Sequence, residues 1–174
     1  DSRKSILNSD KIIFPGVGNF GKVMENLIEK NLDNVIKKAI EYKIPFLGIC
    51  VGYQVLFEKS EESLGIPGLG ILKGKVVKFK STNLKIPQIG WNKIEIKNKN
   101  SRLLKNIPNN TYVYFVHSFY PEVEDGNIVL SKTQYGNGFV SAIESNNLFA
   151  TQFHPEKSGK LGLKILKNFC ELKC

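Results

Sequence analysis

The stretch Pro45-Phe46-Leu47-Gly48-Ile49-Cys50-Val51-Gly52 decides how this chain is expected to fold. Its first five residues form a short apolar run that predicts a buried strand, and residues 51–59 have the pattern of a helix. Between them, the Gly-x-Cys-x-Gly spacing is that of a nucleophile elbow, in which a sharp strand-to-helix turn presents a reactive side chain. The N-terminus of the following helix is expected to favour a thiolate at Cys50. A buried cysteine in a glycine-rich turn fits the stretch equally well.

The flanking residues predict strand–helix units first and a run of strands afterwards. An apolar strand at residues 11–14 ends in Pro15-Gly16-Val17-Gly18, and two amphipathic helical patterns follow it. Later strand patterns lead into an amphipathic closing helix at residues 160–172. These strands are expected at 71–80, 86–96, 112–116, 128–133, 139–144 and 148–153. The order predicts one α/β domain over residues 1–174, with a mixed, mostly parallel central sheet flanked by helices.

Composition narrows the class of protein. The formal charge is +9, yet only two of the 25 basic residues, Arg3 and Arg102, are arginine, the usual reader of bases and phosphates. A solvated lysine surface therefore fits better than a nucleic-acid partner, although an anionic ligand stays open. No apolar run is long enough for a membrane span. The three cysteines are spaced for neither a disulfide framework nor a zinc site, and free thiols suit a reducing cytoplasm.

A second group of reactive residues lies at Gln152-Phe153-His154-Pro155-Glu156. The chain has only two histidines, His117 and His154, so a Cys–His mechanism has few candidates for its base. In an extended segment Glu156 points the same way as His154, which lets the carboxylate reach the imidazole. The pattern predicts a Cys50–His154–Glu156 relay, in which the base activates the thiol and the carboxylate orients the base. Taken alone, an ordinary loop histidine and a solvated carboxylate would explain these residues better.

The loop Pro15-Gly16-Val17-Gly18 is a third candidate. Glycines let a loop turn its backbone N–H groups toward an oxyanion. Without the other two motifs, an ordinary turn would be the better interpretation.

Together these motifs resemble the class I, or triad, glutamine amidotransferases, which have a flavodoxin-like fold. The more specific similarity is to the glutaminase subunit of imidazole glycerol phosphate synthase, and it extends from about Ile12 to Phe169. The matching segments are PGVGNF, GICVGYQ, GLGILKGKV, Gly90-Trp91-Asn92, YFVHSFY and QFHPEKSG.

The resemblance implies roles for individual residues. Cys50 would attack the side-chain amide of L-glutamine, His154 would move the proton and Glu156 would hold His154. The oxyanion hole would be formed by the backbone of Gly16, Val17 and Gly18 with the amide of Val51, and glutamine would bind at Gln54, Glu62, Ser118 and Phe119. No cofactor or metal is implied. Ammonia would pass to a (β/α)₈-barrel cyclase subunit in a heterodimer that makes imidazole glycerol phosphate and aminoimidazole carboxamide ribonucleotide for histidine biosynthesis.

Two departures from the family pattern leave alternatives open. Val51 and Tyr53 stand where the family usually has Leu and Met. A strand and helix that precede Ile12 in the family are absent, so the chain is expected to be N-terminally truncated. One alternative function is a paralogous glutaminase that supplies ammonia for amidino- or amino-sugar synthesis in a surface polysaccharide. Another is an inactive binding module of the same fold, which the intact Cys50, His154 and Glu156 set disfavours.

Overall fold

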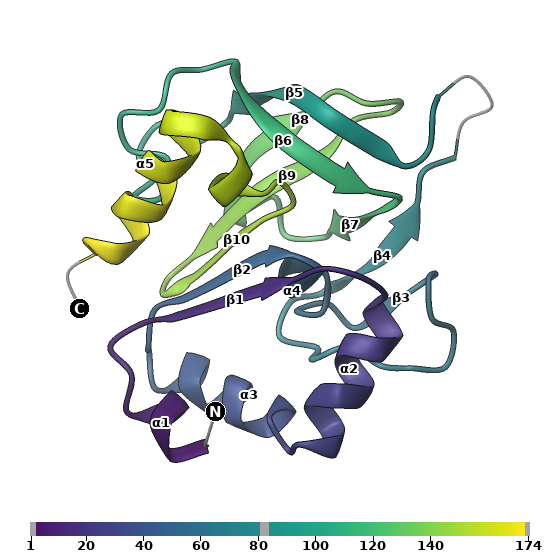
Figure 1. The fold of residues 1–174 in the computed structure, drawn as a ribbon, viewed down its shortest axis with the longest axis vertical. Coiled ribbons are helices and arrows are strands. Elements are labelled where there is room, and N and C mark those ends of the chain that lie inside the picture. Colours follow the sequence, from purple (N-terminus) through teal and green to yellow (C-terminus); the bar gives the residue numbers. More distant parts are fainter. Residues whose placement is uncertain (1–2, 81–83, 173–174) are drawn as a thin grey trace.

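The computed structural model describes residues 3–80 and 84–172. Figure 1 shows a central sheet with helices on both sides. The helices are α1 (Arg3–Leu7), α2 (Phe20–Glu29), α3 (Asp33–Glu41), α4 (Val51–Gln54) and α5 (Gly159–Cys170), with 3₁₀ turns η1 (Gly126–Ile128) and η2 (Pro155–Lys157). The strands are β1 (Ile12–Gly16), β2 (Phe46–Cys50), β3 (Lys59–Ser60), β4 (Gly74–Lys78), β5 (Gln88–Ile96), β6 (Thr111–His117), β7 (Phe119–Val123), β8 (Val129–Thr133), β9 (Phe139–Ser145) and β10 (Leu148–Thr151).

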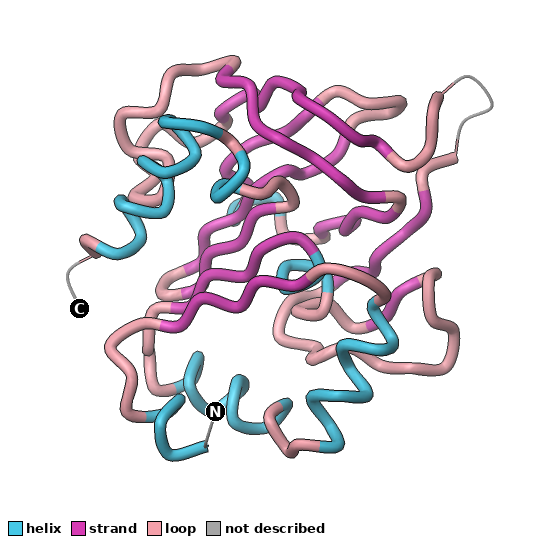
Figure 2. Tube along the Cα trace, in the orientation of Figure 1, coloured by secondary structure: helices cyan, strands magenta, loops and turns pink. Residues whose placement is uncertain are grey.

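Seven strands form the main sheet, in the order β1-β2-β10-β9-β8-β5-β6. The mixed α/β class predicted from the sequence is confirmed, but "mostly parallel" is wrong. Among the described strands of this sheet, β1, β2 and β10 pair in parallel and the other neighbours pair antiparallel. Parallel neighbours need a long crossover, which α2 and α3 provide between β1 and β2. The connections from β8 to β9 and from β9 to β10 are short and hold no helix, so these consecutive strands pair antiparallel (Figure 2).

The helices cover the two faces of the sheet unequally. Helices α1, α2 and α3 lie together on one side of β1 and β2, and α5 lies on the other side against β6 (Figure 1). Asn19 caps α2 through its side chain, which accepts a hydrogen bond from the Lys22 N–H. From α5, Phe169 packs into the core with its ring 5.7 Å from that of Phe149 on β10. Within the described residues, no helix is both long and apolar enough to cross a bilayer.

Helix α4 is shorter than the sequence predicts. A helix is expected over 51–59, but α4 ends at Gln54. The carbonyls that would continue it accept hydrogen bonds from the next loop instead. Leu69 N–H donates to the carbonyl of Val55, and Ile71 N–H donates to that of Leu56. Loop 66–72 therefore takes the place of the later helical turns.

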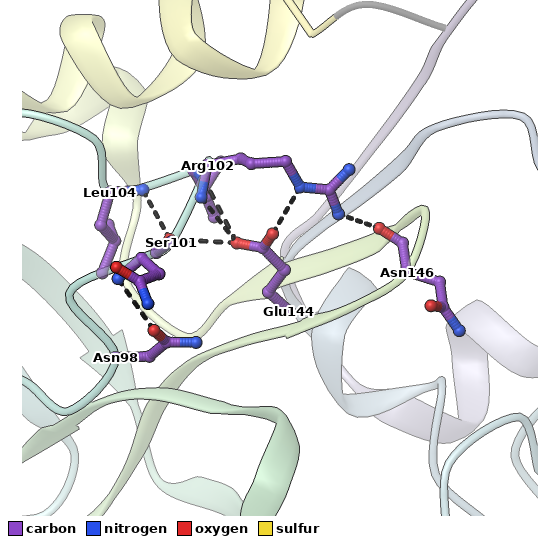
Figure 3. A network of polar contacts seen from close by, with 8 residues as sticks. Asn98, Ser101, Arg102, Leu104, Glu144 and Asn146 are labelled. Atoms are coloured by element: carbon purple, nitrogen blue, oxygen red, sulfur yellow. Dashed lines mark hydrogen bonds and ion pairs between the residues drawn. The ribbon is translucent and has the colours of Figure 1, made fainter.

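A partly buried carboxylate fixes the turn between β9 and β10 (Figure 3). Glu144 on β9 accepts hydrogen bonds from the hydroxyl of Ser101 at 3.0 Å and from Nε of Arg102 at 2.7 Å. The Arg102 guanidinium also contacts the carbonyl of Asn146 and lies over the Phe149 ring. This cluster ties loop 97–110 to the hairpin whose second strand leads into His154.

Candidate active site

The elbow at Cys50 forms where β2 ends and α4 begins. Cys50 adopts φ +55° and ψ −109°, a conformation that costs a non-glycine residue about 1–3 kcal/mol and concentrates at functional sites. Its two flanking glycines are required by packing. A Cβ on Gly52 would stand 2.0 Å from the Phe14 carbonyl oxygen, and one on Gly48 would stand 2.5 Å from that of Gly52. The Gly-x-Cys-x-Gly pattern therefore does allow close backbone packing around a strained cysteine.

His154 is held against β6 by its own backbone. Its N–H donates to the Tyr114 carbonyl at 2.9 Å, and Ser158 bridges the two segments by accepting from Tyr114 N–H and donating to the His154 carbonyl. The Glu156 carboxylate lies 2.7 Å from Nδ1 of His154. The predicted contact between His154 and Glu156 exists, but the segment between them is not extended as predicted. Residues Pro155–Lys157 form a 3₁₀ turn, which brings Glu156 back onto the imidazole.

These elements line a pocket of about 490 Å³. Most site residues predicted from the sequence border it: Val17, Gly18, Cys50, Val51, Gln54, Glu62, Ser118, Phe119 and His154. Gly16 and Glu156 do not line it. Gly16 pairs with Cys50 in the register of β1 and β2, and Glu156 lies behind His154. A larger hollow of about 640 Å³ lies between β5, β7, β8 and β9, but its lining, within the described part of the chain, includes no cysteine or histidine.

Burial controls the protonation state of Cys50, the candidate nucleophile. Burial, helped by the Glu156 and Glu62 carboxylates, raises the pKa of the Cys50 thiol to about 11. The Val51 N–H and the Lys157 ammonium lower the pKa but do not compensate. The N-terminus of α4 favours the thiolate through the Val51 N–H, in the expected direction, but desolvation outweighs this one N–H of a four-residue helix. Cys50 needs a base.

His154, the candidate base, makes no hydrogen bond to Cys50 in this structure. Nε2 of His154 is buried and, among the described residues, has no hydrogen-bond partner. The Cys50 thiol donates instead to the Val116 carbonyl at 3.9 Å. In ligand-free enzymes the hydrogen bond between nucleophile and base is often long and tightens only when substrate binds.

The substrate residues implied by the resemblance already have structural partners. Glu62 accepts a hydrogen bond from the Phe20 N–H at 2.7 Å, which fixes the start of α2 and the end of loop 15–18. Both amide hydrogens of Gln54 are engaged, by the Phe119 carbonyl at 2.9 Å and by Oε1 of Gln152 at 3.2 Å. Only Oε1 of Gln54 can therefore take part in binding.

Sequence reasoning missed Gln152. Its side chain is fully buried, and its Nε2 donates to Sγ of Cys50 at 3.8 Å. An amide at the end of an apolar strand, two residues before the candidate base, was a usable indication. Lys157 and Pro87 also border the pocket without having been predicted.

Comparison with known proteins decides the family. A family profile described as "Glutamine amidotransferase class-I" matches residues 2–172. This chain belongs to the class-I glutamine amidotransferases. The amidotransferase is 53% identical to the imidazole glycerol phosphate synthase subunit HisH of Methanocaldococcus jannaschii, over 99% of this chain and 85% of that protein. It is 53% identical to HisH of Aquifex aeolicus, over 92% of this chain and 77% of that protein.

Solved structures show the same fold at lower identity. A structure described as a glutamine amidotransferase has a TM-score of 0.71 at 16% identity, covering 97% of this amidotransferase and 84% of that chain. The glutaminase domain of Trypanosoma brucei CTPS, with bound acivicin, has a TM-score of 0.65 at 19% identity, covering 99% and 75%.

Proposed function

We propose that this glutamine amidotransferase is the glutaminase subunit of an imidazole glycerol phosphate synthase, working in the cytoplasm on the histidine pathway. It hydrolyses L-glutamine to glutamate and ammonia and passes the ammonia to a cyclase subunit. The observation that carries this proposal is the identity of about half of all residues to HisH proteins over nearly the whole chain. The polysaccharide alternative has no such support among these relatives.

The geometry supports a thioester mechanism. His154 takes the thiol proton of Cys50 as Sγ attacks the amide carbon of glutamine, and the resulting imidazolium gives that proton to the leaving nitrogen as ammonia departs. Water, deprotonated by the same imidazole, then cleaves the glutamyl thioester and regenerates the thiol. Glu156 keeps Nδ1 protonated and so leaves Nε2 free to accept. A neutral thiol with a raised pKa suits this coupled transfer.

Backbone donors beside Cys50 would stabilise the oxyanion. The Val51 N–H already interacts with the thiol, and the pairing of Gly16 with Cys50 brings loop 15–18 to the same place. Gly18 has φ +103°, and a Cβ added to it would meet no atom within 4 Å, so the Val17–Gly18 peptide has room to rotate. One orientation would aim an N–H at the oxyanion and the other would not. One such donor is worth roughly 10²–10³ in rate.

Substrate recognition follows from the charges that line the pocket. Among the described residues that line the pocket, Glu62 is the one carboxylate, and it suits the α-ammonium group of an amino acid. The Ser118–Phe119 segment supplies backbone polar groups, and Oε1 of Gln54 adds an acceptor.

Large apolar side chains near the pocket mouth would meet the partner. Val17 on the pocket rim is 73% exposed, and Ile89 and Trp91, which follow the rim residue Pro87 along the chain, are 61% and 55% exposed. The Trp91 ring packs against that of Tyr114, which in turn lies below the Lys157 ammonium. A (β/α)₈-barrel cyclase docked here would cover the pocket and keep ammonia from bulk water.

The test is steady-state glutamine hydrolysis, first by the chain alone and then with the cyclase partner and its acceptor. Partner and acceptor should raise turnover with a smaller change in glutamine affinity, because docking selects the productive orientation of loop 15–18. Cys50→Ala should abolish hydrolysis while leaving partner binding intact. Equal turnover with and without partner would refute the coupling, and full activity in Cys50→Ala would refute the function.

A further inference from the structure

A chain of buried side chains leads from β5 to the nucleophile. Gln88, His117, Gln54 and Gln152 are each less than 7% exposed. The Gln88 amide lies 3.0 Å from Nε2 of His117, and Nδ1 of His117 lies 2.8 Å from the Phe119 carbonyl. Gln54 donates to that same carbonyl and to Oε1 of Gln152, whose Nε2 reaches Sγ of Cys50. These hydrogen bonds link β5, β6, β7, α4 and the segment that follows β10.

The hydrogens in this chain can be assigned. Burial, with a smaller contribution from the nearby His154, lowers the pKa of His117 to about 4, although the contact with the Phe119 carbonyl opposes the shift. The ring is therefore neutral at pH 7 and carries one hydrogen. The Phe119 carbonyl can only accept, so this hydrogen is on Nδ1. Nε2 is then an acceptor and needs a donor. The structure places Oε1 of Gln88 against it, which would bring two acceptors together, so we assign the Gln88 amide the reversed orientation, with its NH₂ group donating to Nε2.

This assignment excludes a proton relay. Donors from His117 and Gln54 converge on the Phe119 carbonyl, which has no proton to pass on. This series of side chains can instead transmit a displacement from one member to the next. At its far end, the Gln152 amide donates toward Sγ both when Cys50 is a thiol and when it becomes a thiolate, whereas the contact with the Val116 carbonyl requires the thiol proton.

We propose that Gln152 is the positioning residue of Cys50, and that the chain from Gln88 through His117 and Gln54 couples the placement of β5 to the thiol. The proposal rests on the proposed function, in which Cys50 is the nucleophile. Gln88 lies in β5 next to the exposed Ile89, while its own side chain points inward to His117. A partner that presses on β5 therefore acts on the first member of the chain.

The test measures how fast iodoacetamide alkylates Cys50 as a function of pH, by peptide mass spectrometry of the full chain, with the exposed Cys170 as internal reference. Gln152→Met removes the donor and keeps the side-chain length. Its alkylation midpoint should rise by about one pH unit, which corresponds to about a tenfold slower reaction at neutral pH. Gln134→Met is the control, since the Gln134 amide donates to the Gly136 carbonyl in its own turn and does not line the pocket at Cys50, and it should leave the midpoint unchanged.

Two further variants test the coupling. Gln88→Met should shift the Cys50 midpoint in the same direction by a smaller amount, although Gln88 does not touch Cys50. Combined with Gln152→Met it should cause no further shift of the midpoint, because Gln152→Met already breaks the series of hydrogen bonds. Additive shifts, or no shift in Gln88→Met, would overturn the coupling.

A near-isosteric variant keeps the test decisive if Gln152→Met does not fold. Gln152→Glu cannot donate when ionised and repels a thiolate, so its midpoint should rise at least as far. An unchanged midpoint in either Gln152 variant would overturn the positioning role. The alkylation readout needs no turnover, so a failed glutaminase assay with an intact midpoint shift would count against the proposed function and not against this inference.

Discussion

Replacing His117 with asparagine should flatten the acid dependence of stability. Asparagine keeps a donor near the Nδ1 position for the Phe119 carbonyl but cannot titrate. Burial lowers the pKa of His117 from 6.5 to about 4 in the folded chain. As pH falls below 6.5 the unfolded chain binds a proton that the folded chain refuses, so folded stability is full above pH 6.5 and is lost progressively down to pH 4.

The size of the effect follows from the shift. Each pKa unit corresponds to about 1.36 kcal/mol, so His117 should account for about 3 kcal/mol of the stability lost on acidification. The assay is urea unfolding of the original chain and of His117→Asn, at about pH 7.5 and about pH 4.5. Groups that titrate in both proteins cancel in the comparison. The same loss of unfolding free energy in both would refute the buried, neutral histidine.

Three other substitutions test separate parts of the structure. His154→Asn should lower partner-activated glutamine hydrolysis by more than ~10²-fold, the range expected for a general base, and His117→Asn should lower it much less; equal losses would leave no distinct base. Tyr53→Phe should raise the free energy of unfolding by about 1 kcal/mol in urea titrations, because the buried Tyr53 hydroxyl has no partner among the described residues; a fall would reveal a partner. Glu144→Gln should lower the free energy of unfolding by about 2 kcal/mol by weakening the contacts to Arg102. An unchanged urea midpoint would contradict the role of the Figure 3 cluster.

Local patterns predicted the elements that carry the candidate chemistry. The apolar run before Cys50 and its flanking glycines predicted the strand and the turn, because a side chain at either glycine would collide with backbone. The spacing of His154 and Glu156 predicted their contact, although the turn that makes it is 3₁₀.

What the sequence could not predict depends on distant partners. Helix α4 ends early because loop 66–72 takes its carbonyls. The raised pKa of Cys50 reflects burial by elements far along the chain. Gln152 gains its contact with Cys50 only because β10 pairs with β2, a pairing that joins residues about a hundred positions apart and that no local pattern encodes.

The most direct measurement of whether Cys50 is the nucleophile of a glutaminase is active-site labelling by acivicin, the ligand bound to the glutaminase domain of Trypanosoma brucei CTPS. The chain is incubated with acivicin in the presence of its partner, and the modified peptide is located by mass spectrometry. One adduct should form on Cys50, L-glutamine should slow its formation, and His154→Asn should slow it further. An adduct on Cys170 or Cys174, or labelling of Cys50 that glutamine does not slow, would contradict the assignment.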